Sequence, residues 1–263
     1  MRLGLAANQL HHAHANAALF RWLHECEVGI RELELGLHAV GRTYDAIHRA
    51  GYLDRYLPLR RYPYGREGGL MKLVAEVVGL DDDRVLDGAI YLIDPVDPSS
   101  IFPEAIALKR QCVIHGKPFI STVATARDWI EMERIHAGLA PDSGANLFHD
   151  LQSQTLALIA HDAMKPQMLA YAAEHFDVLS RFAHRVGTGT TGQRLNELAW
   201  SRGWPVDTPW VERYQSGPMG GDAQIADLVL ERAVTTRTDH AVCMTTPKVA
   251  ARWAAAVVLR AKA

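Results

Sequence analysis

Three short segments in the second half of the chain carry residues suited to holding an anion. They are His161-Asp-Ala-Met-Lys165, Gly187-Thr-Gly-Thr-Thr-Gly192 and Ser216-Gly-Pro-Met-Gly-Gly-Asp222. A cation and free N–H groups at a helix start favour phosphate or carboxylate, and glycines let the backbone approach an anion closely. Each segment alone also suits a helix cap or a tight turn. The three in this order predict an anion-binding site, with Asp222 as a carboxylate that could act as a base.

The elements that position these segments are predicted from hydrophobic runs. Short apolar runs are typical of buried strands, and the expected strands are Leu3–Ala7, Ala89–Ile93, Pro118–Val123, Leu156–Ala160 and Ala241–Met244. Expected helices include Thr125–His136, Pro166–His175 and Val249–Ala261. Alternating strands and helices predict an α/β fold, in which parallel sheets are flanked by helices. Because the three segments follow strands, we expect them at the carboxyl edge of a sheet, where such folds bind ligands.

The chain also resembles itself. The segment from Arg61 to Gly69 matches the segment from Arg213 to Gly221, and Asp87–Pro95 matches Asp239–Pro247 at the same separation. We therefore predict a tandem duplication. Residues 1–137 form the first copy, residues 138–153 a linker, and residues 154–263 a second copy that lacks the last strand and helix.

The segments HDxxK, TGTTG and SGPMGGD, in this order and at this spacing, resemble those of the methylglyoxal synthases. The resemblance implies two tandem Rossmann-like units and conversion of dihydroxyacetone phosphate to methylglyoxal and phosphate, without metal or organic cofactor. It implies that Asp222 is the catalytic base and that His161 and Asp162 form the pocket's His-Asp pair. The substrate phosphate would be contacted by Lys165, Thr188, Gly189, Thr190, Thr191, Ser216 and Gly217.

The first copy differs at the corresponding positions, which hold Asn8, Gln9, His12, the segment Val40–Tyr44 and Leu70. We therefore expect the first copy to have lost this pocket. Because leucine cannot remove a proton, the first copy should not catalyse the reaction alone. Arg42 and Arg66 could still bind an anion there, or they could be ordinary surface arginines.

The later part of the family's pattern is preserved in the first copy instead. Asp94 lies before Pro95, and Glu104 stands where a second carboxylate is expected, whereas the second copy has Thr246 before Pro247. Two interpretations stay open. Asp94 and Glu104 complete the second copy's pocket across an interface, or they are remnants and the second copy works without them.

The whole-chain composition excludes several classes of function. A net charge of −2 gives no basic field to attract nucleic acid or an anionic membrane, and no apolar run is long enough to span a bilayer. The first residues lack a secretory pattern, and three scattered cysteines favour a reducing compartment, so we expect a cytoplasmic protein. His11, His12 and His14 have no spacing typical of metal ligands and are expected to be exposed.

These observations favour a methylglyoxal synthase-like phosphate lyase with its active centre in the second copy. The alternative is a non-catalytic sensor that binds phosphate or a phosphorylated metabolite. The family resemblance and the duplication predict a homo-oligomer, a trimer of two-unit chains.

Overall fold

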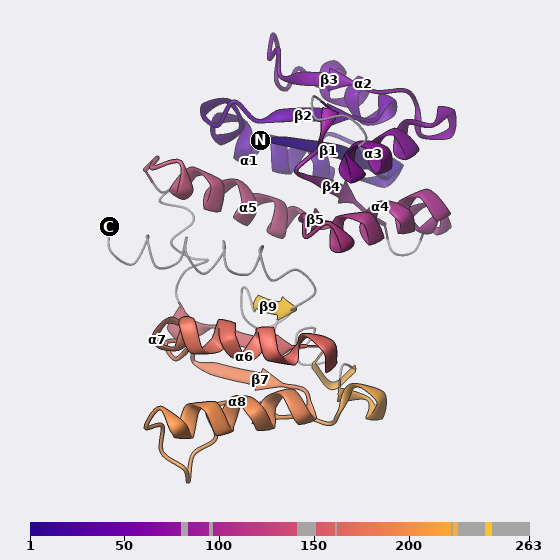
Figure 1. The fold of residues 1–263 in the computed structure, drawn as a ribbon. Helices are drawn as coiled ribbons and strands as arrows, with labels where there is room; N and C mark the ends of the chain where they lie inside the picture. Colours follow the sequence, from indigo (N-terminus) through magenta and orange to yellow (C-terminus); the bar gives the residue numbers. More distant parts are fainter. Residues whose placement is uncertain are drawn as a thin grey trace. The chain divides into compact units, whose positions relative to one another are not determined.

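The computed structural model describes residues 1–79, 84–94, 97–140, 151–160, 162–221, 223–225 and 240–243 (Figure 1). The chain divides into two compact units, which are Met1–Pro141 (unit 1) and Asp142–Ala263 (unit 2). Each unit contains a parallel sheet flanked by helices, which confirms the predicted fold class. The duplication and the exact domain limits stay predictions.

Unit 1 contains a five-stranded sheet in the order β3-β2-β1-β4-β5, with parallel pairing throughout. The strands are β1 (Arg2–Ala7), β2 (Gly36–Ala39), β3 (Leu59–Arg61), β4 (Gly88–Leu92) and β5 (Phe119–Ile120). The helices are α1 (Ala18–Glu32), α2 (Gly41–Arg49), α3 (Gly69–Val78), α4 (Pro103–Ile114) and α5 (Val123–His136). Short 3-10 helices include η1 (Gln9–His12), η2 (Gly65–Glu67) and η4 (Pro98–Ile101).

The core of unit 1 follows from the alternation of side chains along its central strand β1. Leu3 and Leu5 are fully buried, and Gly4 between them lies under Leu73 of α3. A Cβ at Gly4 would come within 2.9 Å of that leucine side chain, so the glycine lets α3 approach the sheet. Helix α3 packs on α4, and α1 packs on α5.

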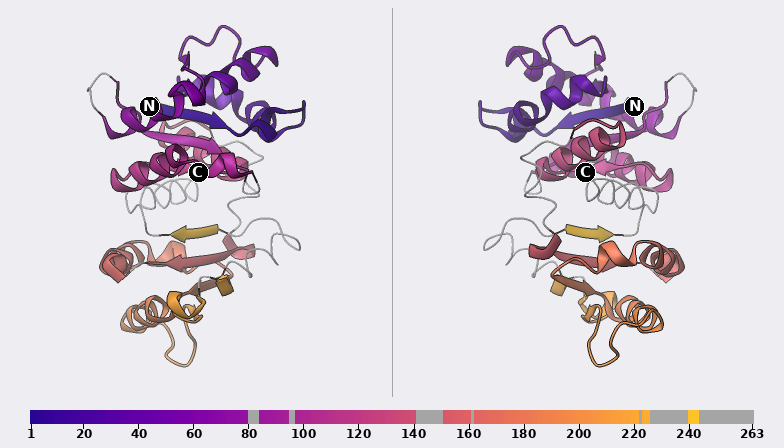
Figure 2. Two further views of the ribbon diagram at one scale, coloured as in Figure 1. Left: turned by 90° about the vertical axis from the view of Figure 1, so that its right-hand side faces the viewer. Right: turned by 90° about the vertical axis from the view of Figure 1, so that its left-hand side faces the viewer.

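Unit 2 contains a four-stranded parallel sheet in the order β8-β7-β6-β9. The strands are β6 (Thr155–Ile159), β7 (His184–Gly187), β8 (Glu212–Arg213) and β9 (His240–Cys243), and Figure 2 shows β9 alongside β6. The helices are α6 (Lys165–Glu174), α7 (Phe176–Leu179) and α8 (Gly189–Ser201), with 3-10 helices η6 (Leu151–Ser153), η7 (Asp162–Met164) and η8 (Gly217–Met219).

The core of unit 2 is built on β6 in the same alternating way. Leu156 and Leu158 are fully buried in one cluster with side chains of α6 and α8, whereas Ala157 belongs to a second cluster with Val186 and Ile225. Helices α6 and α8 contact each other over the first cluster. The sheet therefore has a buried side chain layer on each face.

One expected strand has other bounds in the structure, and one expected helix cannot be compared with it. The strand expected over Pro118–Val123 is only Phe119–Ile120, because Thr122 caps α5 by accepting a hydrogen bond from the Thr125 N–H. The helix expected over Val249–Ala261 lies outside the described residues.

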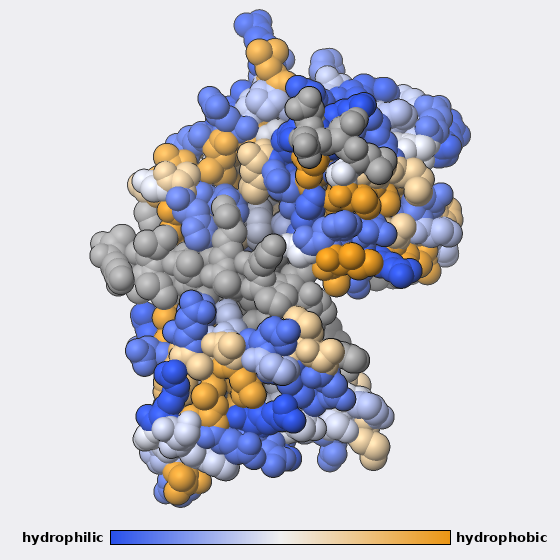
Figure 3. Space-filling model, viewed as in Figure 1, coloured by the Kyte–Doolittle hydropathy of each residue, from blue (hydrophilic) through white to orange (hydrophobic). Residues whose placement is uncertain are grey.

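Unit 1 has an apolar stretch on its surface. Separately, none of the helices among the described residues is long and apolar enough to cross a membrane. Hydrophobic side chains are visible on the α4 side of unit 1 in Figure 3. The large apolar residues of η4 and α4 that are more than half exposed are Ile101, Phe102, Ile106 and Ile114. These side chains are not part of the core of unit 1.

Candidate functional site

The fold brings the three chemistry-bearing segments of unit 2 to one edge of its sheet. Strands β6, β7 and β8 are neighbours and parallel, so the residues that follow them meet at the carboxyl edge. Two hydrogen bonds join the threonine-rich segment to the residues that immediately precede the other two segments. The Gly189 N–H donates to the Gln215 carbonyl at 3.0 Å, and the Thr191 hydroxyl donates to the Ala160 carbonyl at 3.4 Å. The predicted neighbourhood of these segments is therefore present.

The threonine-rich segment forms the start of α8. Thr188 is the N-cap residue, but its side chain makes no capping hydrogen bond, so it does not satisfy the first-turn N–H groups of α8. Thr190 is exposed on the first turn, whereas Thr188 and Thr191 are buried, and their hydroxyls lie 3.5 Å apart. The start of this 13-residue helix thus offers donors to an anion, while Thr191 braces it against β6.

Glycines are required in the loop after β8 because the backbone passes close to itself. Gly220 has φ +91°, which side chains rarely tolerate. A Cβ at Gly221 would lie 1.8 Å from the Gln215 carbonyl oxygen, and a Cβ at Gly189 would lie 3.0 Å from the Ser216 nitrogen. The loop of Ser216 and Gly217 can therefore lie against the start of α8 only with these glycines.

Lys165 is the first residue of α6, and only 11% of its side chain is exposed. A cation at a helix N-terminus is opposed by the helix dipole. Asp162, whose side chain is 86% exposed, offsets this cost through an ion pair with the Lys165 amino group. An anionic ligand near Lys165 would be stabilised by the same charge.

Two residues of the predicted catalytic set, His161 and Asp222, lie outside the described residues. Glu104, considered as a second carboxylate, lines a pocket of its own unit 1. Asp94 donates its backbone N–H to the Ser100 hydroxyl at 2.8 Å.

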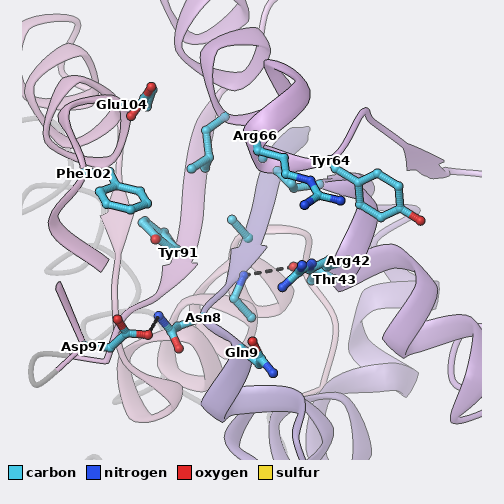
Figure 4. A pocket seen from close by; sticks show the side chains of 15 residues that line it. Asn8, Gln9, Arg42, Thr43, Tyr64, Arg66, Tyr91, Asp97, Phe102 and Glu104 are labelled. Carbon is cyan, nitrogen blue, oxygen red and sulfur yellow. Dashed lines mark hydrogen bonds between the residues drawn. The ribbon is translucent and has the colours of Figure 1, made fainter. Parts of the chain in front are cut away.

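Unit 1 has a pocket at the corresponding edge of its sheet, lined by side chains other than those of the motif, and the expected loss of the motif's phosphate pocket stays a prediction (Figure 4). The pocket measures about 470 Å³ and lies at the carboxyl ends of β1, β2 and β4. The motif side chains are absent, but the backbone that forms the hollow remains. Arg42, Arg66 and Glu104 line it, together with Asn8, Gln9 and Leu70.

Sequence analysis missed three contributors to this pocket, which are Tyr91, Asp97 and Phe102. Asp97 accepts a hydrogen bond from the Asn8 side-chain amide at 3.0 Å. The available signal was a second Asp-Pro pair, since Pro98 follows Asp97 shortly after Asp94 and Pro95.

The expectation of exposed histidines near the N-terminus is wrong for two of the three. His14 is exposed, but His11 and His12 are half-buried, and His11 Nε2 lies 2.6 Å from the Ile93 carbonyl oxygen. Burial lowers the pKa of His12, and the nearby positive charges of Arg42 and Arg49 lower it further. No group of three metal-ligating side chains gathers within the part of the chain that the structure describes.

Comparison with known proteins finds similarity to one kind of enzyme, although no family model matches the chain. Over 81 residues the chain is 46% identical to methylglyoxal synthase of Thermus thermophilus, covering 31% of this chain and 57% of that protein. Methylglyoxal synthases of Pseudoalteromonas atlantica and Treponema socranskii are 44% and 41% identical, with about 30% of this chain and 51% and 48% of those proteins covered.

Among solved structures, methylglyoxal synthase from Elizabethkingia anophelis NUHP1 is 28% identical, with a TM-score of 0.28. That match covers 36% of this chain and 57% of the other. The chain spans about half the length of the curated relatives it matches. About a third of this chain is therefore homologous to methylglyoxal synthases.

Proposed function

We propose that unit 2 is a methylglyoxal synthase-like phosphate lyase, which eliminates phosphate from dihydroxyacetone phosphate to give methylglyoxal. The observation that carries this proposal is the meeting of three segments at one sheet edge. The uncapped start of α8, the loop of Ser216 and Gly217 and the cation Lys165 all follow neighbouring strands. The similarity of about a third of the chain to proteins named methylglyoxal synthase supports the same activity.

In this proposal the substrate phosphate lies at the start of α8. It accepts hydrogen bonds from first-turn N–H groups, from the hydroxyls of Thr188 and Thr190, and from the Ser216 loop. Lys165 supplies positive charge that stabilises the departing phosphate. Thr191 positions the helix through its hydrogen bond to Ala160.

The reaction needs a base beside the substrate carbonyl, and we assign this role to Asp222. The carboxylate removes a proton from the hydroxymethyl carbon, and the electron pair forms an enediolate. The enediolate then breaks the carbon–oxygen bond to phosphate, and the resulting enol takes a proton at carbon to become methylglyoxal. His161 and Asp162 complete the catalytic set. Neither a metal nor an organic cofactor is needed for these steps.

A sensor that binds phosphate or a phosphorylated metabolite is the second candidate. The sequence favours it in one respect, because Thr246 stands where the first copy has Asp94. The sheet of unit 2 also has four strands among the described residues, whereas the sheet of unit 1 has five. A sensor would use Lys165 and the start of α8 without proton removal.

One experiment separates the two functions. The purified full chain is mixed with dihydroxyacetone phosphate in deuterated water, and methylglyoxal, phosphate and deuterium incorporation are measured. A lyase releases both products and exchanges substrate hydrogen. Binding without exchange or release identifies a sensor.

The assembly and cellular location are separate proposals. The proposed assembly is a homo-oligomer, a trimer of two-unit chains, in the cytoplasm. Light scattering of the purified chain in dilute solution tests the assembly, and a monomer would contradict it.

A further inference from the structure

The pocket of unit 1 has two chemically different walls. Figure 4 shows Arg42 and Arg66 on one side of the hollow and Asp97, Phe102 and Glu104 on the other. Arg42 belongs to α2 and Arg66 to η2, whereas Glu104 lies in the first turn of α4. Segments far apart in sequence therefore place opposite charges across one cavity.

The two arginines are not neutralised by neighbouring side chains. Among the described residues, the side chains of Arg42 and Arg66 have no ion pair and no hydrogen bond. The contrast with nearby Arg61 is informative, because Arg61 makes two hydrogen bonds to the Asp45 carboxylate at 2.9 and 3.0 Å. The protein thus pairs one arginine beside the pocket and leaves the two that line it for another anion.

The surroundings of the arginines add to their attraction for an anion. Helix α2 begins at Gly41 beside Arg42, and its N-cap residue Val40 cannot supply a side-chain hydrogen bond. Tyr64 is held in place at this wall, since its hydroxyl donates to Asp45 at 2.9 Å. An anion here would face two guanidinium groups and the positive end of a helix dipole.

The opposite wall suits a hydrogen-bond donor. Glu104 is half-buried, and its carboxylate has no ion pair or hydrogen bond within the described part of unit 1. Asp97, at the other end of this wall in Figure 4, accepts a hydrogen bond from the Asn8 amide. Apolar side chains, including Leu70 and Phe102, also line the pocket. A ligand that satisfies both walls must combine an anionic group with a hydroxyl or ammonium group.

We propose that the pocket of unit 1 binds a small organic anion. Arg42 and Arg66 hold its phosphate or carboxylate group, and Glu104 accepts a hydrogen bond from its hydroxyl or ammonium group. The volume of about 470 Å³ is within the range of organic ligand sites and far exceeds what an inorganic ion needs. Leu70 supplies no base, so this site binds its ligand without removing a proton. The inference is independent of the activity proposed for unit 2.

The first test measures binding of phosphoethanolamine to the full chain by titration calorimetry. A Lys165→Ala background weakens the phosphate site of unit 2, so the remaining heat reports unit 1. We expect Arg42→Gln with Arg66→Gln to weaken binding at least ~10-fold, because charge-assisted hydrogen bonds are lost. Arg49→Gln is the matched control, since Arg49 is exposed on the same helix but does not line the pocket.

A second test examines the Glu104 wall with matched probes. Propyl phosphate lacks the ammonium group of phosphoethanolamine, and butyrate lacks that of 4-aminobutyrate. The protein should prefer each amino probe over its partner, and Glu104→Gln should abolish this preference. Comparison of the two amino probes shows whether phosphate or carboxylate is the favoured anion. Because Glu104→Gln is a conservative change, this second test stays valid even if the protein with Arg42→Gln and Arg66→Gln does not fold.

His12 provides an independent readout of occupancy. Because the charge of Arg42 lowers the pKa of His12, an anion bound at Arg42 should raise that pKa in an NMR titration. The proposal is overturned if none of the four probes binds. It is also overturned if the double arginine variant binds phosphoethanolamine as tightly as its background, or if Glu104→Gln keeps the preference for amino probes.

Discussion

The two units share a backbone arrangement at the edge where each pocket is expected. In unit 1 the Gly41 N–H donates to the Pro63 carbonyl at 3.1 Å, and in unit 2 the Gly189 N–H donates to the Gln215 carbonyl at 3.0 Å. Val40 and Thr188, which precede these glycines, have nearly the same backbone angles, with φ −61° and −69°. The first turns of α2 and α8 are therefore held against the next loop in the same way.

The loop after β3 in unit 1 and the loop after β8 in unit 2 also have similar backbone conformations. Gly68 has φ +89° and Gly220 has φ +91°. A Cβ at Gly69 would lie 2.0 Å from the Pro63 carbonyl oxygen, and a Cβ at Gly221 would lie 1.8 Å from that of Gln215. These shared features support the predicted duplication, which stays a prediction.

The side chains around this common backbone differ in charge and chemistry. Unit 2 presents threonine hydroxyls and Lys165, whereas unit 1 presents Arg42, Arg66 and Glu104. The glycines and backbone hydrogen bonds at this edge are therefore common to the two units, and the difference between the units lies in the side chains.

The largest expected effect concerns Asp222, on which the catalytic difference between the units rests. Asp222→Asn keeps size and hydrogen-bonding capacity but removes a base, so turnover of dihydroxyacetone phosphate should fall at least ~10²-fold. Phosphate binding should persist, because Lys165 and the threonines are unchanged. Steady-state assay of methylglyoxal formation measures the change, with Asp207→Asn as an exposed control. Equal turnover by Asp222→Asn and wild type would remove Asp222 from the mechanism.

A second pair of variants tests the shared backbone. Gly69→Ala and Gly221→Ala each force a Cβ against a carbonyl oxygen, so each should destabilise its unit by roughly 2 kcal/mol. Urea denaturation followed by tryptophan fluorescence measures both changes. Gly65→Ala is the control without crowding, since the nearest atom to its Cβ position is a Leu70 carbon 3.9 Å away. Crowding is not the reason for the glycines if Gly69→Ala and Gly221→Ala cost no more than Gly65→Ala.

A smaller effect should distinguish two threonines at the same place in the helix. The Thr43 hydroxyl accepts a hydrogen bond from the Ala7 N–H at 3.0 Å, whereas the Thr191 hydroxyl donates to a carbonyl at a longer 3.4 Å. Thr43→Val leaves a backbone N–H unpaired, so it should cost about 1 to 2 kcal/mol. Thr191→Val should cost less, under ~1 kcal/mol. The same urea experiment ranks the two variants, and the reverse order would contradict this account.

The smallest effect is the contribution of the buried His38 to the pH dependence of the stability of unit 1. His38 Nδ1 lies 2.6 Å from the Tyr62 hydroxyl, which donates to Glu76, and burial lowers the pKa of His38. Glu76 opposes this shift, while the charges of Arg2, Arg60 and Lys72 add to it. A lowered folded-state pKa favours neutral histidine, so its stabilising contribution is present above about pH 6.5 and lost below it.

The stability of unit 1 should therefore decrease as the pH falls through the mildly acidic range. His38→Gln should reduce this pH dependence, whereas His14→Gln, which changes an exposed histidine, should not. Thermal unfolding at a series of pH values measures the difference. An unchanged pH dependence in His38→Gln would show that His38 does not titrate on unfolding.

Local pattern was sufficient for much of the fold. Strand β1 over Arg2–Ala7 and helix α6 over Lys165–Glu174 lie within a residue or two of their expected ranges, because each apolar run is bounded by clear turn or cap residues. The strand expected over Pro118–Val123 was too long, because apolar residues did not reveal that Thr122 would cap a helix. Thr122 is a residue type that favours a helix N-cap, but it lies within the apolar run that predicted the strand.

The α/β class and the meeting of the unit 2 segments at one sheet edge follow from the amino-acid sequence alone. The apolar runs and the glycine spacing can be recognised locally in the sequence. Because adjacent parallel strands have their carboxyl ends at the same edge of the sheet, the segments that follow them meet there. The pocket of unit 1, with Arg42 and Arg66 facing Glu104 across it, could be found only from the three-dimensional structure. A hollow depends on backbone contacts between distant segments, such as Gly41 with Pro63, and the pattern of residues along the chain does not reveal such contacts.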